Sequence, residues 1–425
     1  MIQRFASIFN FLHVRKKVIL ALFTIVFWAA AIGYSFYLGD ALRYPDERWY
    51  FNDYAHNLAK LHMFSRDGIA PTAFHQPLYP LLLGVLVMLG AGVTAARLVN
   101  FLALFVTWLI LFFWLGKRRP GLTQVFSLIL ALAYPILFYT AGTLYPQTLG
   151  SLFFVLAITL YWQEPFRMWH AILAGIALGL AVLTIPTFLF VPFFMLLFSL
   201  VFRRNTLQKV LLLLILTFVV MIPWTVRNYL VFHRFVLIST NFGINFLIGN
   251  SPATTPNNGV NAAKDLEYVF KEVAERNLDE FEANEFYIKK TFAFFQEDPM
   301  HYFSLYALKV LNYFNFRNEL STSSEASFTK DLLMLITYGC LVTITLLRLL
   351  MFRRYPLTKI EIFLLLLYMS SAFVAAIFFT RIRFRLPFDY LLIAIAALFL
   401  GRLVEGSLLR IMNGSAPPSP ATHPG

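Results

Sequence analysis

The chain has 425 residues, of which 59% are hydrophobic and only 13% are charged, and its mean hydropathy is +0.68. In a soluble globular protein about a quarter of the residues are charged. This composition therefore excludes that class and predicts helices that face lipid. The net charge of +13 does not indicate nucleic-acid binding, because the basic residues form short clusters between apolar segments. The single cysteine, Cys340, excludes a disulfide framework and a thiolate metal cluster.

Ten apolar segments are expected to be membrane spans, because a helix needs about 20 apolar residues to cross the hydrocarbon core. The first segment follows Arg15-Lys16-Lys17, and its length favours a retained signal-anchor over a cleaved signal peptide. The fifth and sixth segments are short, which predicts a tight hairpin or partial burial. The expected spans are 18–38, 94–116, 122–141, 145–162, 168–184, 186–202, 207–225, 330–350, 359–380 and 385–404.

The apolar run 77–89 is an exception, because it is short and Pro77 and Pro80 open it. Its length suits an interfacial or re-entrant helix better than a span. With this run left out, the basic clusters, including 117–119 and 353–354, fall on the cytoplasmic side together with the N-terminus. The sequence therefore predicts that 39–76, 227–329 and the arginines near 383 lie on the opposite, non-cytoplasmic face.

These assignments divide the chain into four parts. We expect an N-terminal transmembrane module at 1–225 with a first periplasmic loop at 39–93, a periplasmic loop region at 226–329, C-terminal transmembrane helices at 330–410 and a disordered tail at 411–425. Within the loop region, 261–298 carries nearly half of the acidic residues and predicts two amphipathic helices on the membrane surface. The tail is rich in Pro, Ser and Ala, which is typical of disorder.

An acidic pair follows the first span. Asp46 and Glu47 come after Pro45, which predicts a short helix with both carboxylates in its first turn. Ordinary acids at a helix start are the alternative interpretation. Asp53 lies one to two turns further on and is a candidate second acid.

Candidate binding residues gather at the same face, where ionisable groups near a bilayer usually line a cavity. Arg97 lies at the outer end of the second span, although it could equally snorkel to the interface. Amides in the stretch 228–250 could line a polar pocket, with an interfacial belt and turns as the alternative. An extended segment would put the arginines at 381–385 on one face, suited to phosphate or to lipid headgroups. The candidate binding residues are Asp53, His75, Arg97, Arg227, Asn228, Asn241, Asn245, Arg381, Arg383 and Arg385.

The order of these motifs resembles that of the GT-C polyprenyl-phosphate-sugar glycosyltransferases, which include protein O-mannosyltransferases and the aminoarabinose transferases of lipid A, with the bacterial family-39-type branch nearest. The resemblance covers nearly the whole chain. It departs at Gln147, where the family often has an acid, at 184–186, which reads Thr-Ile-Pro for Thr-Arg-Pro, and at His75-Gln76-Pro77 for a double proline. The motifs are Asp46-Glu47, 75–80, 96–98, 223–229, 238–250, Asp298-Pro299 before a helix with Lys309, and 383–387.

The resemblance implies an all-α integral membrane protein of GT-C type, with about 10–11 transmembrane helices, periplasmic juxtamembrane helices and one larger periplasmic loop region. It also implies an inverting hexosyl- or pentosyltransferase on the periplasmic face of a bacterial inner membrane. The enzyme would move a sugar from a polyprenyl-phosphate donor to a lipid, glycan or protein acceptor.

Phosphate leaves as a stable anion, so this reaction needs one carboxylate rather than a pair. Asp46 is the expected general base, and Glu47 would position it or the sugar. Arg227 and the three arginines at 381–385 would stabilise the departing phosphate.

No cofactor is firmly predicted, and a divalent cation held by Asp46, Glu47 and Asp53 with waters stays open. One competing interpretation is a non-catalytic flippase or transporter for a lipid-linked sugar, and another is a degenerate relative that acts as a scaffold. Transporters usually place ionisable residues at the bilayer midplane between inverted repeats. The conspicuous residues here fall at the outer rim, which favours surface chemistry. The sequence identifies neither the sugar nor the acceptor.

Overall fold

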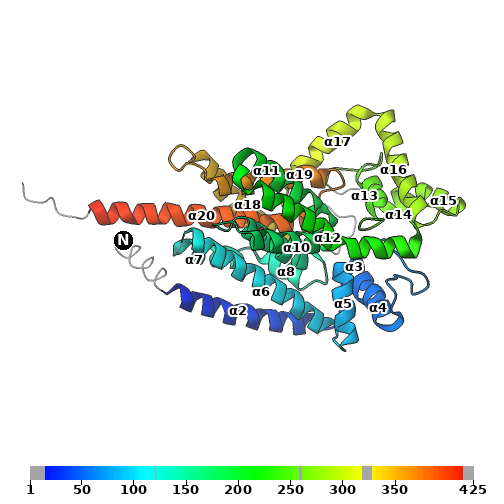
Figure 1. The fold of residues 1–425 in the computed structure, drawn as a ribbon, viewed down its shortest axis with the longest axis horizontal. Helices are drawn as coiled ribbons and strands as arrows, with labels where there is room; N and C mark the ends of the chain where they lie inside the picture. Colours follow the sequence, from blue (N-terminus) through cyan, green and yellow to red (C-terminus); the bar gives the residue numbers. More distant parts are fainter. Residues whose placement is uncertain (1–14, 120, 258–260, 318–327, 415–425) are drawn as a thin grey trace, which may run out of the picture.

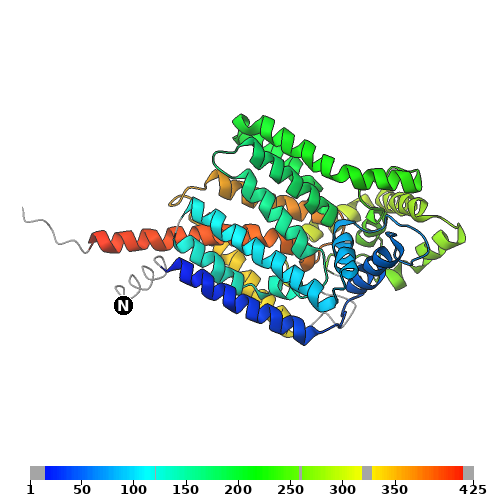
Figure 2. The same ribbon diagram turned by 60° about the horizontal axis from the view of Figure 1, so that its bottom comes forward.

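The computed structural model describes residues 15–119, 121–257, 261–317 and 328–414, with side chains up to residue 405. Long helices lie side by side in a bundle, and short helices gather at one of its ends (Figures 1 and 2). The bundle helices are α2 (Lys16–Leu38), α6 (Val93–Arg118), α7 (Leu122–Leu132), α8 (Pro135–Ala141), α9 (Gln147–Tyr161), α10 (Met168–Thr184), α11 (Phe190–Phe202), α12 (Leu207–Phe232), α18 (Phe328–Leu350), α19 (Lys359–Ala376) and α20 (Ile382–Gly414).

The short helices at the end of the bundle are called the capping layer here. They form two groups in the sequence, one between α2 and α6 and the other between α12 and α18. The first group is α3 (Pro45–Arg48), the π-helix η1 (Trp49–Ala55), α4 (His56–Leu61) and α5 (Leu78–Met88). The second group is α13 (Phe242–Gly249), α14 (Ala262–Asp265), α15 (Glu267–Glu275), α16 (Glu280–Glu297) and α17 (Pro299–Asn312).

Each of the ten segments expected to span the membrane is helical. In the described part of the chain, six helices are long and apolar enough to cross a membrane, or seven if the bent pair α7–α8 counts as one. That pair bends by 61° before Pro135, which lacks the N–H that would continue α7. Four further apolar helices are shorter than 18 residues, namely α5 of the capping layer and, in the bundle, α9, α10 and the stretch from Pro186 to Phe202.

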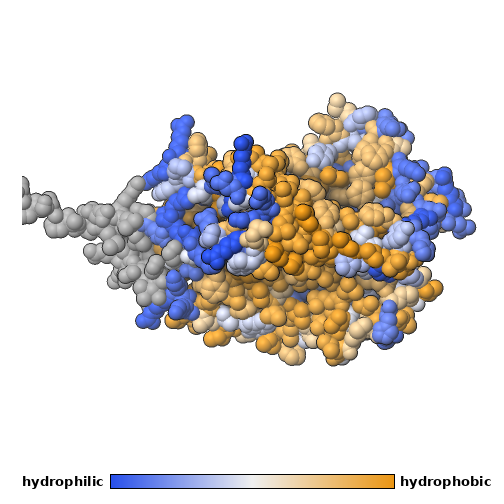
Figure 3. Space-filling model, viewed as in Figure 1, coloured by the Kyte–Doolittle hydropathy of each residue, from blue (hydrophilic) through white to orange (hydrophobic). Residues whose placement is uncertain are grey.

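The surface agrees with a membrane environment. Figure 3 shows an apolar band between two hydrophilic ends of the molecule. Large apolar side chains are exposed within this band, among them Ile25 at 66% and Leu197 at 62%. Lipid is the solvent in which such exposure carries no hydrophobic cost. The chain is therefore a multi-pass, all-helical membrane protein.

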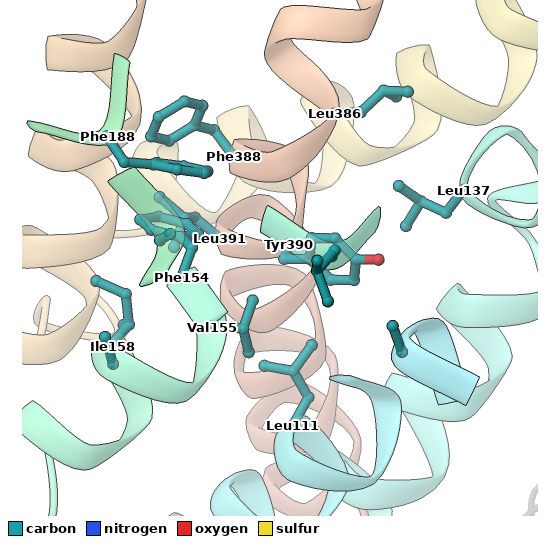
Figure 4. Close-up of a cluster of buried hydrophobic side chains, with 14 of the residues drawn as sticks. Leu111, Leu137, Phe154, Val155, Ile158, Phe188, Leu386, Phe388, Tyr390 and Leu391 are labelled. Atoms are coloured by element: carbon teal, nitrogen blue, oxygen red, sulfur yellow. The ribbon is translucent and has the colours of Figure 1, made fainter. Parts of the chain in front are cut away.

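The core is built around α20. In its most apolar 18-residue segment, 78% of the residues are buried, whereas in that of α2, at the edge of the bundle, only 22% are. Aromatic side chains pack on it, as Phe154 stacks on Phe188 at 4.9 Å and meets Phe388 edge-on at 5.1 Å (Figure 4). The start of α20 is thereby held in place by the lipid-embedded core.

Two glycines let α10 and α12 approach closely. A Cβ on Gly175 would lie 2.6 Å from the carbonyl oxygen of Leu213, and one on Gly179 would lie 2.5 Å from Cβ of Val220. Glycines four residues apart form a groove along one helix face that accepts the neighbouring backbone. This pair explains why α10 packs stably although it is only 17 residues long.

The structure corrects three boundaries. Helix α20 begins at Ile382, so the segment with the arginines is not extended, and α12 continues to Phe232, past the expected end at 225. Arg383 and Arg385 lie two helical residues apart, so they point about 200° away from each other rather than to one face. Residues 411–414 belong to α20, and the rest of the expected tail lies outside the described residues.

Candidate active site

Asp46 and Arg383 form an ion pair between the capping layer and the bundle. Asp46 lies in the first turn of α3, after Pro45, as the sequence predicted. Nη1 of Arg383, in the first turn of α20, donates to Oδ2 of Asp46 at 2.6 Å. The two side chains are 26% and 29% exposed, so the pair is sheltered but accessible.

Arg383 has capacity for a second partner. Its guanidinium lies over the ring of Tyr145 at 5.4 Å and that of Phe384 at 5.0 Å, and these contacts orient it toward Asp46. Its Nε is buried and has no acceptor among the described residues. A buried N–H without a partner is costly, so an anion that accepted it would bind favourably.

Glu47 is turned away from Asp46 into the protein. It is 2% exposed, and its carboxylate accepts backbone N–H groups from Arg43 at 2.8 Å, Tyr44 at 3.0 Å and Leu144 at 2.9 Å. These bonds occupy the carboxylate. In the structure Glu47 holds the backbone that carries Asp46.

Arg97 does not snorkel. It is 1% exposed, and its guanidinium donates to the carbonyl oxygens of Gly39, Ala41 and Gly142, the last at 3.0 Å. On the same helix, Nδ2 of Asn100 donates to the carbonyl oxygen of Thr143 at 2.8 Å. Helix α6 thus fixes the two backbone segments that flank the acidic pair.

His75 lies among aromatic rings beside η1. The Tyr54 hydroxyl is 2.9 Å from its Nδ1, and its ring meets Trp49 at 5.9 Å and Tyr50 at 5.5 Å. Burial lowers the pKa of His75 to about 4, against the opposing effect of the nearby Asp46 carboxylate. The imidazole is therefore neutral at physiological pH and leaves Nε2 as its second hydrogen-bonding atom.

Asp53 lies on η1, two turns after Asp46. Burial raises the pKa of its carboxyl group, and the charge of Arg66 acts in the opposite direction. No three His, Cys, Asp or Glu side chains gather into a metal-binding group within the described ranges. The three acids at 46, 47 and 53 therefore do not converge on one point.

Arg227 and Asn228 serve the backbone at the end of α12. Arg227 donates to the carbonyl oxygen of Thr72 at 3.0 Å and packs against Trp224, at 4.8 Å from its ring. Asn228 is fully buried and donates to the carbonyl oxygen of Val236 at 3.1 Å. These contacts join α12 to the neighbouring loops of the capping layer.

Asn241 and Asn245 lie at the start of α13. Nδ2 of Asn245 donates to the backbone oxygen of Asn241 at 2.8 Å, and Oδ1 of Asn241 accepts from Ser239 at 2.9 Å. These contacts are local, and both side chains are part of the turn that begins the helix.

The three arginines near 383 have separate surroundings. Arg381 lies over the ring of Phe379 at 5.0 Å, in the link between α19 and α20. Arg385 is 1% exposed, lies 3.3 Å from the Asp389 carboxylate and donates to the carbonyl oxygen of Tyr313 at 3.0 Å. The expected shared face is wrong, and Arg383 is the member of the group that reaches Asp46.

Sequence reasoning missed two acids, the buried Asp389 and the partly buried Glu280. Asp389, paired with Arg385, also accepts hydroxyl groups from Tyr134 at 2.6 Å and Tyr368 at 3.1 Å. Its spacing of four residues from Arg385 on one helix was a usable signal. Glu280 joins α16 to the loop before α5 by accepting the backbone N–H of Ala73 at 3.1 Å, a long-range contact with no local signal.

The chain was compared with known proteins. No known sequence family matches it, and no curated protein does. Its fold is similar to that of ArnT from Cupriavidus metallidurans bound to undecaprenyl phosphate, with 14% identity, a TM-score of 0.43 and coverage of 93% of this chain and 81% of that one. It is also similar to the apo state of the same ArnT, with 13% identity, a TM-score of 0.40 and coverage of 94% and 81%. At these values the case for a function rests on the residues of the chain itself.

Proposed function

We propose that this chain is an inverting membrane glycosyltransferase that transfers a sugar from a polyprenyl-phosphate donor. The observation that carries the proposal is the Asp46–Arg383 pair, in which a carboxylate and a guanidinium from opposite ends of the sequence meet at an accessible point. A base for the acceptor and a cation for the departing phosphate are the two groups that such a transfer requires.

The reaction assigns one task to each partner. The acceptor oxygen attacks the anomeric carbon from the face opposite the phosphate, and its proton passes to Asp46. The bond from the anomeric carbon to the phosphate oxygen breaks, and the phosphate leaves with the bonding electrons. Arg383 stabilises that charge through its guanidinium group, whose Nε has no acceptor among the described residues.

The ion pair between Asp46 and Arg383 implies that donor binding precedes proton transfer to Asp46. While Arg383 is bonded to Asp46, one carboxylate oxygen is occupied. A donor phosphate that takes over the guanidinium releases this oxygen to accept a proton. Donor binding therefore activates the base.

The donor tail would approach along α5. Three apolar side chains at the C-terminal end of α5 are exposed, namely Val85 at 50%, Met88 at 48% and Leu89 at 77%. In a membrane this surface meets acyl chains, so an isoprenoid tail could lie on it while its phosphate reaches Arg383. We place this end of the molecule on the periplasmic face of a bacterial inner membrane, where a lipid, glycan or protein acceptor is available.

Deletion of the gene followed by mass spectrometry of envelope lipids and proteins tests the function. The expected result is the loss of one sugar mass, which the wild-type chain restores. The Asp46→Asn variant should lower the transfer rate by about 10²–10⁴. Full restoration by that variant, at equal protein level, would show that Asp46 is not the base.

A further inference from the structure

A buried lysine of the capping layer is bonded to three oxygen atoms. Lys309 of α17 is 0% exposed, and its Nζ donates to the carbonyl oxygens of Gly249 at 2.9 Å and Phe378 at 2.8 Å and to Oδ1 of Asn250 at 2.8 Å. In the described part of the chain no carboxylate forms an ion pair with it. An ammonium group has three N–H bonds, and this site uses all of them.

The three oxygens belong to two segments that meet closely. Gly249 and Asn250 end α13, whereas Phe378 lies in the link between α19 and α20. A Cβ on Gly249 would lie 2.0 Å from the carbonyl oxygen of Phe378, so only glycine permits this approach. Asn250 adds a bond from Nδ2 to the carbonyl oxygen of Ile377 at 2.9 Å.

A second residue of α17 holds the same link. Nδ2 of Asn312, three residues after Lys309, is 2.8 Å from Oγ1 of Thr380. The link from 377 to 380 is therefore bonded to α17 at Phe378 and at Thr380, shortly before α20 presents Arg383. Movement of this link would move the first turn of α20 and with it the cation that pairs with Asp46.

We infer that Lys309 is a positioning residue whose ammonium group fixes the link 377–380 and thereby the place of Arg383 against Asp46. The inference deepens the proposed function and rests on it for its effect on sugar transfer. A carboxylate partner would have neutralised the ammonium charge, whereas the three neutral oxygens hold the cation by hydrogen bonds alone. Burial lowers the pKa of Lys309 to about 7. The neutral amine has only two N–H groups for the three acceptors, so all three bonds form only in the ammonium state.

Hydrogen exchange tests the structural part without any substrate. Lys309→Met keeps the unbranched side chain up to the position before Nζ and removes its charge and donors. We expect it to raise amide exchange in peptides that cover 377–384 and 43–50. The control is Lys289→Met, because Lys289 is a lysine of the same layer that is 79% exposed, and its exchange pattern should match the wild type. A rise confined to α13 and α17 would overturn the inference.

Chemical rescue tests the role of the cation. Lys309→Ala removes the four side-chain atoms that propylammonium contains and leaves its three oxygens in place. Propylammonium chloride should raise the melting temperature of this variant above that in sodium chloride of equal ionic strength. Lys309→Met should show no such rise, because its side chain fills the space. An equal response of the two variants would contradict a cation site.

Enzyme kinetics separate this inference from the proposed function. In the wild-type background, Lys309→Met should raise the KM for the polyprenyl-phosphate donor about tenfold, and in an Arg383→Ala background it should add nothing. An unchanged KM in an active enzyme would reduce Lys309 to a structural residue. If the wild type transferred no sugar at all, the proposed function would fail, while the exchange and rescue results would still decide the position of the link.

Discussion

Glu47 and Arg97 hold the same two backbone segments, 39–44 and 142–144, by opposite chemistry. Glu47 accepts their N–H groups, and Arg97 donates to their carbonyl oxygens. Asp46 lies between these anchors on α3. The proposed base is thus positioned by one buried acid and one buried cation. Neither of these two side chains contacts Arg383 in the described part of the chain.

Glu47→Gln should destabilise the protein as well as slow it. The amide would present an NH₂ group where a carboxylate oxygen now accepts backbone N–H groups, which costs about 1–3 kcal/mol. We expect a lower melting temperature in detergent together with reduced transfer. Asp46→Asn, at the partly exposed ion pair with Arg383, should retain the wild-type melting temperature. The reverse pattern would exchange the roles of the two acids.

Arg383→Lys should affect donor binding more than the chemical step. Lysine keeps the charge but not the planar pair of N–H groups that can bind one phosphate in two places. We expect the donor KM to rise about tenfold, while kcat changes less than it does in Asp46→Asn. Titration of the donor at saturating acceptor measures both. A fall in kcat alone would contradict a role in donor binding and would confine Arg383 to the charge that develops as the phosphate leaves.

His75 should make the protein sensitive to acid. Burial lowers its pKa to about 4 from the ordinary value of 6.5, so the unfolded chain binds more protons between these two pH values. Stability therefore rises with pH across this window, is fully gained above 6.5 and is lost as the pH falls toward 4, by up to about 3 kcal/mol. His75→Gln should flatten the melting temperature between pH 6.5 and 4. An unchanged slope in that variant would assign the acid sensitivity to other groups.

Gly179→Leu should disrupt the packing of α10 on α12. The added side chain meets Val220 at a position where a Cβ alone already approaches to 2.5 Å. Overpacking of this kind costs about 1–3 kcal/mol or more, which would lower the melting temperature and the yield of folded protein. The matched control is Gly33→Leu on α2, where a Cβ meets nothing within 4 Å. Equal effects of the two substitutions would contradict the glycine groove.

Local pattern predicted much of the fold. Apolar length located all ten bundle segments, and Pro45 predicted the helix start that carries Asp46. The shortness of the apolar run 77–89 also identified it as something other than a span. In the structure this run forms α5, an 11-residue helix in the capping layer. The expectation for the arginines at 381–385 failed because it assumed an extended segment, whereas α20 begins at Ile382 and continues through Pro387.

Long-range partners limited what the sequence could predict about the site. The burial of Glu47 depends on the N–H of Leu144, almost a hundred residues away. The acceptors of Lys309 are mostly backbone oxygens, which leave no trace in residue type. The meeting of Asp46 and Arg383 was expected only in outline, as acids opposite arginines, because no spacing rule relates positions 337 residues apart.

The enclosure of α20 has a consequence for how such a site can diversify. Arg383 belongs to α20, whose most apolar segment is 78% buried and which Arg119 and Glu405 also tie to its neighbours at the opposite end through a contact of 2.6 Å. Asp46 belongs to a thin external layer that can change in length and composition without unpacking that helix. In the proposed reaction, the half of the site that binds the donor phosphate is thus part of the bundle core, and the half that meets the acceptor lies in a layer that can be rebuilt.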